Sequence, residues 1–158
     1  MQTKFEVLQA IIKSWCETQD VEAVIAHLTE DVVWHYSATA AAPKIGHDGA
    51  REFLKAYKLK ARRPNWRIFR AAEAGNALFV EGADEFDTVE GGHVAVPYMG
   101  IFEFEGQRIK AWRDYFNPGL VAEGERGVSP PDYVRALLDR PVLPGSGSQP
   151  SPIQGVAS

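Results

Sequence analysis

Three long segments in the middle of the chain, residues 77–88, 93–105 and 107–116, alternate between apolar and polar side chains. A period of two is the signature of a β-strand that turns one face toward the core. A fourth such segment, residues 66–72, precedes them, and the stretches EAGN, VEGG and EGQ separate the four. Long neighbouring strands with short glycine-containing turns predict an antiparallel meander.

The N-terminal part of the chain predicts helices. Apolar residues recur at helical spacing in residues 4–17, and a second stripe follows Asp20, which is a suitable N-cap. The segment DVVWHYS (31–37) predicts a strand, and GHDGAREFLKAYK (46–58) predicts a third helix. Together these elements predict an α+β domain in which three helices wrap a curved antiparallel sheet into a cone with an internal pocket.

The C-terminal segment differs in composition from the rest. Residues 130–140, PPDYVRALLDR, predict a short helix, whereas residues 141–158 are rich in proline, glycine and serine. Such a segment buries too little apolar surface to fold alone. We therefore expect one domain over residues 1–140 and a flexible tail over residues 141–158.

Composition and charge narrow the function classes. With 158 residues and a net charge of −4, the chain suits a single domain and gives no reason to expect a nucleic-acid partner. The basic run at 58–67 is interpreted as a solvated helix end, with a phosphate patch as the alternative. No apolar run reaches the length of a membrane span, and the N-terminus lacks a signal peptide's apolar core. A single cysteine, Cys16, excludes an internal disulfide. Together with the missing span and signal peptide, this makes a cytoplasmic, reduced environment the default expectation.

Two aspartates interrupt apolar strand faces. Asp84 shares a face with Gly82 and Phe86, and Asp114 lies between Trp112 and Phe116 on its own strand. On the strand between them, one face is apolar except for a single phenol; it comprises Val94, Val96, Tyr98, Gly100, Phe102 and Phe104. If these faces line one cavity, two acids meet in an apolar site, where one pKa is raised and the pair offers a proton donor and an acceptor.

Other interpretations of these residues remain open. Asp84 could pair with a cation, and a register slip of one residue would turn Asp114 to solvent and bury Arg113 instead. Tyr36 and Tyr98 either hydrogen-bond a substrate oxygen or are core residues, and His35 is either a proton relay or structural. Metal-ligand spacing, a phosphate-binding loop and a serine elbow are missing from the sequence, so neither metal nor cofactor is expected.

The helix GHDGAREFL after the first strand and the closing segment GIFEFEGQRIKAWRDYFN resemble the nuclear-transport-factor-like cone fold. Within that fold the chain is most similar to the branch of limonene-epoxide hydrolases and SnoaL-like polyketide cyclases. The resemblance covers residues 4–122, and WRDYF is its most specific motif.

The resemblance implies roles for individual residues. Asp84 matches the family's acid, which acts on the epoxide oxygen, and Asp114 matches the base, which acts on water. Gly82 stands at the position of the arginine that bridges the two acids, so a larger cavity is expected beside Asp84. Trp34 and Tyr36 stand where the family has a water-binding tyrosine and asparagine, which places both in the pocket and His35 outside it.

The resulting hypothesis is an acid–base enzyme for a small apolar molecule of terpenoid, polyketide or steroid type. Epoxide hydrolysis is the leading reaction, and cyclisation or isomerisation is the alternative. The expected catalytic residues are Asp114, Asp84, Tyr36 and Tyr98, and the expected substrate pocket comprises Trp34, Gly82, Phe86, Val96, Trp112 and Phe116. The competing hypothesis is a non-catalytic binding or dimerisation module, because Phe79, Met99 and Ile101 on the opposite face would suit a homodimer.

Overall fold

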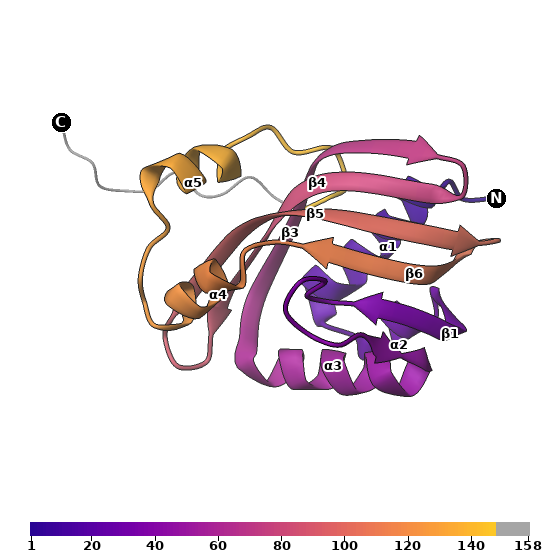
Figure 1. Cartoon of the computed structure of the whole chain (residues 1–158), viewed down its shortest axis with the longest axis horizontal. Helices are drawn as coiled ribbons and strands as arrows, with labels where there is room; N and C mark the ends of the chain where they lie inside the picture. The colour runs from indigo at the N-terminus through magenta and orange to yellow at the C-terminus, as the bar shows by residue number, and fades with distance from the viewer. Residues whose placement is uncertain (148–158) are drawn as a thin grey trace.

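A single curved, unclosed sheet of six strands organises the protein (Figure 1). The computed structural model describes residues 1–147. The strand order is β2-β1-β6-β5-β4-β3, and neighbours are antiparallel except β1 and β6, which are parallel. The strands are β1 (Leu28–His35), β2 (Lys44–Ile45), β3 (Ala61–Ala74), β4 (Ala77–Thr88), β5 (His93–Glu105) and β6 (Arg108–Tyr115). The predicted meander corresponds to β3–β6.

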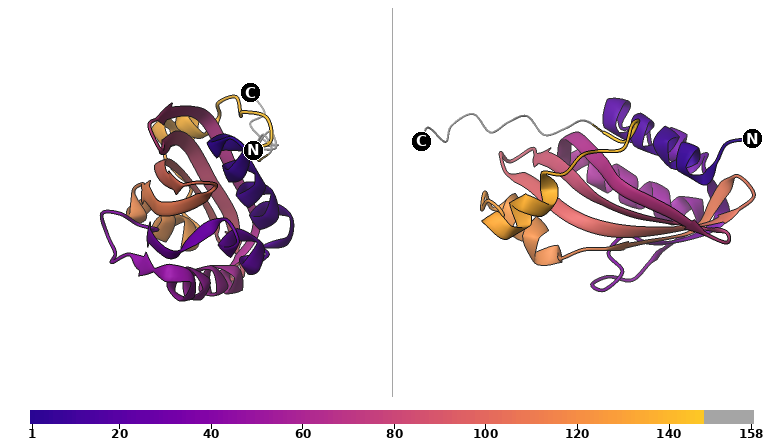
Figure 2. Two further views of the ribbon diagram at one scale, coloured as in Figure 1. Left: turned by 90° about the vertical axis from the view of Figure 1, so that its right-hand side faces the viewer. Right: turned by 90° about the horizontal axis from the view of Figure 1, so that it is seen from above.

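The helices form two groups. On one face of the sheet lie α1 (Lys4–Thr18), α2 (Val21–Ile25) and α3 (Gly46–Lys60). Two short helices, α4 (Pro118–Glu125) and α5 (Asp132–Leu138), follow β6 and lie close together at one end of the molecule (Figure 2). Within residues 1–147, no helix is both long enough and apolar enough to cross a bilayer.

Local sequence signals explain where the first helices begin. Thr3 and Glu6 form a reciprocal capping box, in which Thr3 Oγ1 accepts from the Glu6 amide and Glu6 Oε2 accepts from the Thr3 amide. Asp20 caps α2, as its sequence position predicts, by accepting a hydrogen bond from the Ala23 amide. These caps fix the residues at which α1 and α2 begin.

The main core lies between the N-terminal helices and the concave face of the sheet. α1 contributes its apolar stripe, and the strands contribute their inward-facing residues. A smaller apolar cluster lies on the opposite face, where Val134 and Leu138 of α5 pack with Phe69, Ala83 and Ala95. The sheet is therefore covered on both sides along part of its length.

Residues 141–147, which composition assigns to a flexible tail, lie against the edge strand β3. The Leu143 amide donates to the Ile68 carbonyl at 2.8 Å, and the fully buried Ser146 hydroxyl lies 3.3 Å from both the amide and the carbonyl of Ile68. The edge strand supplies free backbone groups, which composition alone does not reveal. The remaining residues of the predicted tail, 148–158, lie outside the described residues.

The sequence did not predict α4 or the parallel pairing of β1 with β6. α4 contains Gly119 and Gly124, which disfavour a helix, but a Cβ at Gly124 would lie 2.6 Å from the His93 carbonyl oxygen. Close packing of α4 on β5 therefore requires a residue without a Cβ at position 124. The parallel pairing of β1 with β6 was also not expected, because the two strands are far apart in sequence.

Candidate active site

A cavity of about 640 Å³ lies between the concave face of the sheet and the helices. Most of its wall is apolar, and much of that is aromatic, from Trp15, Trp34, Tyr36, Phe53, Tyr57, Trp66, Phe86, Tyr98, Trp112 and Phe116. Two acids, Asp84 and Asp114, also line it. Volume and composition are those of a small-molecule site.

The structure brings the expected site residues together in this cavity, with one exception. Strand alternation carries Asp84 and Asp114 to the concave face, while Arg113 lies on the other face and pairs with Glu103 at 3.0 Å. The alternative with a slipped register is therefore excluded. His35 does not line the cavity. The exception is Gly82, which is absent from the lining.

Gly82 does not enlarge the cavity, because neighbouring atoms fill the space beside it. A Cβ at this position would lie 2.2 Å from the carbonyl oxygen of Arg67 and 3.1 Å from Cε1 of Tyr98. The register of β3 against β4 shifts just beyond this point, between Ile68 and Arg70. Glycine here allows the irregular β3 backbone and the Tyr98 ring to approach β4 closely.

Asp84 is held by a phenol from α3. The Tyr57 hydroxyl donates to Asp84 Oδ2 at 3.1 Å, and the Tyr57 ring is wedged among Trp15, Phe53 and Phe86. Burial raises the pKa of Asp84 to about 6, against the opposing effects of the Tyr57 hydrogen bond and a backbone hydrogen bond. The helical spacing of Tyr57 on α3 indicates burial but does not indicate the direction of its hydroxyl.

Asp114 is held by tryptophan. The indole Nε1 of Trp112 donates to Asp114 Oδ1 at 3.0 Å. Burial raises the pKa of Asp114 to about 8; the indole hydrogen bond opposes this effect and the negative charge of Asp84 adds to it. Neither aspartate has a cationic partner among the described residues.

Tyr98 lies between the two acids on the intervening strand. Its register partner on β4 is Gly82, and Gly100, two residues along β5, is the partner of Asp114. Its hydroxyl oxygen accepts a hydrogen bond from Trp66 Nε1, which leaves the hydroxyl proton available for another acceptor. Burial, and then the charge of Asp114, raises the pKa of Tyr98 well above its usual value, so this phenol stays protonated.

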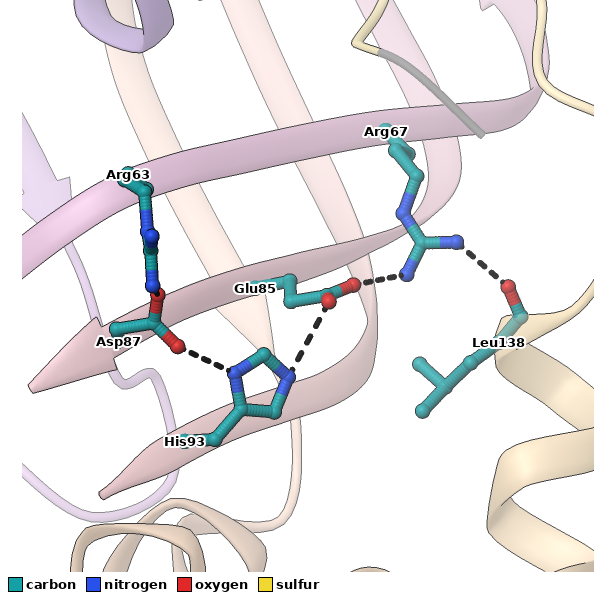
Figure 3. A network of polar contacts seen from close by, with 6 residues as sticks. All are labelled: Arg63, Arg67, Glu85, Asp87, His93 and Leu138. Carbon is teal, nitrogen blue, oxygen red and sulfur yellow. Dashed lines mark hydrogen bonds and ion pairs between the residues drawn. The ribbon is translucent and has the colours of Figure 1, made fainter. Parts of the chain in front are cut away.

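The acids on the opposite face of β4 are paired with basic side chains (Figure 3). Glu85 accepts from the buried Arg67 at 2.8 Å, and Arg67 also donates to the carbonyl of Leu138 at 2.7 Å. Asp87 lies 2.7 Å from His93 Nδ1, and its pKa is lowered, first by that contact. The convex-face acids are thus ion-paired structural groups, whereas the concave-face acids face an apolar cavity.

Two ion pairs lie at the cavity wall, one between α3 and α4 and one between β2 and α3. Lys60, the last residue of α3, pairs at 3.0 Å with Glu125, the last residue of α4, and both side chains line the cavity. Lys44 and Glu52 form a second, longer pair at 3.5 Å and also line the cavity. Within residues 1–147, no group of three His, Cys, Asp or Glu side chains is placed to hold a metal ion.

A curved, unclosed sheet covered by helices around an apolar cavity defines the nuclear-transport-factor-like fold. Residues 8–112 match the model of the SnoaL-like domain, and the chain belongs to this family. A comparison with curated proteins found no match.

Solved structures of the same fold have low sequence identity to this chain. A nuclear-transport-factor-like protein of unknown function from Burkholderia pseudomallei is 18% identical (TM-score 0.69; 78% of this chain and 98% of that chain covered). An epoxide hydrolase of the limonene-epoxide-hydrolase-like type from Mycobacterium tuberculosis is 22% identical (TM-score 0.65; 78% and 90%). A putative polyketide cyclase from Pseudomonas putida is 18% identical (TM-score 0.66; 78% and 98%). At these identities the likeness shows the fold alone.

Proposed function

We propose that the protein is an acid–base enzyme acting on a small, largely apolar molecule bound in the cavity. One observation carries this proposal: Asp84 and Asp114 line the same apolar cavity without a cationic partner among the described residues. Between about pH 6 and pH 8 such a pair retains one proton. It then offers one donor and one acceptor, which general acid–base catalysis requires.

The environments of the two acids favour a particular division of roles. Asp84 has the lower pKa of the two, and the Tyr57 hydroxyl stabilises its charged form. Asp114, with a pKa of about 8, holds the shared proton at neutral pH. We therefore assign the base to Asp84 and the acid to Asp114, the reverse of what the family resemblance implies.

Epoxide hydrolysis is the leading reaction. Asp114 donates its proton to the epoxide oxygen while Asp84 removes a proton from water, whose oxygen attacks the ring carbon as the carbon–oxygen bond breaks. The product is a diol, and return of one proton from Asp84 to Asp114 restores the pair. Support comes from the fold shared with an epoxide hydrolase and from the two acids that line one cavity, Asp84 on β4 and Asp114 on β6.

Proton-transfer isomerisation or cyclisation is the second candidate, and the position of Tyr98 favours it. A Cβ at Gly100 would lie 3.0 Å from Tyr98 Cε2 and 3.1 Å from Asp114 Oδ1, so the phenol and the acid lie over the same residue. Two donors side by side suit a carbonyl oxygen that gains negative charge. Asp84 would remove the proton from the carbon next to that carbonyl.

A substrate screen tests the proposal. Wild type and the variants Asp84→Asn and Asp114→Asn are incubated with small epoxides, lactones and enones, and products are identified by mass spectrometry. We expect turnover of at least one class and a loss of roughly 10²–10⁴-fold in each variant. Turnover that both variants retain at the wild-type rate would rule out this chemistry, and binding without turnover would favour a binding module.

The convex face supports a proposal about assembly. Met99 is 52% exposed and Phe79 is 37% exposed, and both lie on the side of the sheet away from the cavity. We propose that this face forms a homodimer, as exposed apolar strand residues suggest. Analytical ultracentrifugation of wild type and Met99→Lys tests this, with a shift to monomer expected in the variant and a monomeric wild type contradicting it.

A further inference from the structure

Trp34 has a buried polar atom without a partner at the cavity. Its side chain is 3% exposed, and Nε1 makes no hydrogen bond of ordinary geometry with a described residue, although it lies close enough to the Asp114 carboxyl group to lower the pKa of that acid. Buried polar atoms without partners also occur in Thr29, His35 and Arg67, but only Trp34 among these four residues lines the cavity. An indole nitrogen can only donate. A buried donor without an acceptor is destabilising.

Packing holds the Trp34 ring in place. It stacks on Trp112 with ring centroids 4.1 Å apart and an interplanar angle of 14°, and it meets the edge of Phe53 at 5.0 Å. Trp34 and Trp112 are also register partners between β1 and β6. The Trp34 ring is therefore packed on two sides, which limits its rotation and fixes the direction of the Nε1–H bond.

The unpaired N–H lies next to Asp114. Trp112, the stacked partner, donates to Asp114 Oδ1, and the Trp34 indole also favours the charged form of Asp114, although it makes no hydrogen bond of ordinary geometry. An acceptor atom bound against the Asp114 carboxyl group therefore comes within reach of Trp34 Nε1. Two donors then converge on one position in the cavity.

We infer that Trp34 Nε1 and the Asp114 carboxyl group together bind one oxygen atom of the ligand. Because both groups donate to it, that oxygen must accept two hydrogen bonds, and the oxygen of a ketone, an enone or an epoxide can do so with its two lone pairs. The wall around it is aromatic, so the rest of the ligand is apolar. This inference rests on the proposed function in one respect, the protonated state of Asp114, and it names the substrate class of that site.

A pair of inert probes isolates the hydrogen bond. In 2-acetylnaphthalene a ketone oxygen is available, whereas 2-isopropenylnaphthalene has a methylene group in its place and nearly the same shape. Both are measured by isothermal titration calorimetry at pH 6.5 with wild type, Trp34→Phe and Trp15→Phe. Trp34→Phe keeps an aromatic ring and removes the N–H, while Trp15→Phe changes another tryptophan of the cavity wall and serves as the matched control.

We expect wild type and Trp15→Phe to prefer the ketone, and we expect Trp34→Phe to lose roughly 3–10-fold of that preference. Using the ratio of the two affinities cancels any general loss of packing in the variant. Replacement of Trp34 by 3-benzothienylalanine, which exchanges N–H for sulfur in a ring of similar shape, gives the same test if the phenylalanine variant folds poorly.

Three results would overturn the inference: no ketone preference in wild type, an unchanged preference without the Trp34 N–H, or an equal loss of affinity for both probes. The last would mean that Trp34 is only an apolar wall. Neither probe is an epoxide, and binding is read without turnover. A failed substrate screen therefore leaves this test intact, and a failed probe test leaves the acid–base proposal standing.

Discussion

The Tyr57 hydroxyl on α3 lies 3.1 Å from Asp84 Oδ2 on β4, whereas the second acid of the cavity, Asp114, accepts from an indole of its own strand. The two carboxyl groups thus share a cavity but have different donors. Burial raises both pKa values; the Tyr57 phenol opposes this effect at Asp84, and the Trp112 indole opposes it at Asp114. The negative charge of Asp84 raises the pKa of Asp114 further, so Asp84 is the more acidic member and the proposed base.

Tyr57→Phe should raise the pKa of Asp84. The ring contacts of Tyr57 with Trp15, Phe53 and Phe86 can persist, but the hydrogen bond to the carboxylate is lost. A hydrogen bond to a charged group contributes roughly 1.5–3 kcal/mol, so the pKa should rise by about one unit or more. Infrared titration of the carboxyl stretch measures this directly.

Tyr36→Phe is the control for that variant, because Tyr36 lines the same cavity from β1's end and stacks on Phe53. It should leave the Asp84 titration unchanged. Equal midpoints in wild type and Tyr57→Phe would show that the phenol does not set the acidity of Asp84.

Stability should fall as the pH rises through the titration of the two cavity acids. Their folded-state pKa values of about 6 and about 8 lie above the ordinary 3.8, so the folded chain binds these protons more tightly than the unfolded chain. Their contribution is complete below about pH 4 and is lost as the pH rises to about 8. Asp114→Asn removes the larger part of this loss.

Urea unfolding at pH 6 and pH 9 tests whether stability falls as the pH rises. From pH 6 to pH 9 the free energy of unfolding of Asp114→Asn should improve relative to wild type by more than about 1.4 kcal/mol, the equivalent of one pKa unit. Glu22→Gln is the control, because the pKa of Glu22 is lowered first by its hydrogen bond with Arg51, so this carboxylate stays charged over this range. A pH-independent difference for Asp114→Asn would contradict the account.

Gly82→Ala should destabilise the protein although it adds only one methyl group. The new Cβ would meet the Arg67 carbonyl oxygen at 2.2 Å, and backbone cannot move aside as a flexible side chain can. Overpacking of this kind costs about 1–3 kcal/mol. Gly119→Ala on α4, where the methyl group meets only the Asn117 side chain, is the control. Equal melting temperatures for the two variants would mean that β3 and β4 do not approach as described.

Ser146→Ala should loosen the contact between the C-terminal segment and β3. The Ser146 hydroxyl accepts from the Ile68 amide and lies 2.6 Å from the Leu143 carbonyl oxygen. Its removal leaves the buried Ile68 amide without that acceptor, at a cost of about 1–3 kcal/mol. Thermal unfolding should show the loss, whereas the exchange of Ser14 on α1 for alanine should have little effect. Unchanged stability in Ser146→Ala would argue against the contact.

The sequence predicted what depends on periodicity. Alternation along β4 and β6 placed Asp84 and Asp114 on the face that lines the cavity, because a strand fixes which side chains share a face. It did not predict partners from other elements. Tyr57 is a core residue by its helical spacing, and only the packing of α3 over β4 shows that its hydroxyl meets Asp84.

The sequence also did not predict where the close approach of another backbone segment requires glycine. The resemblance marked Gly82 as a lost arginine and predicted extra space, whereas the β3 irregularity fills that space with a carbonyl group. Likewise, Gly124 lowers the helix propensity of α4 but allows it to pack on β5. Both glycines have a tertiary cause that no local pattern contains.

The most direct test of the central claim is a carboxyl titration of protein labelled with ¹³C at aspartate Cγ, with signals assigned through Asp84→Asn and Asp114→Asn. We expect midpoints near pH 6 for Asp84 and near pH 8 for Asp114, and a lower midpoint for Asp114 once the charge of Asp84 is removed. Two midpoints at or below the ordinary value of 3.8, with no change at Asp114 in Asp84→Asn, would contradict this claim.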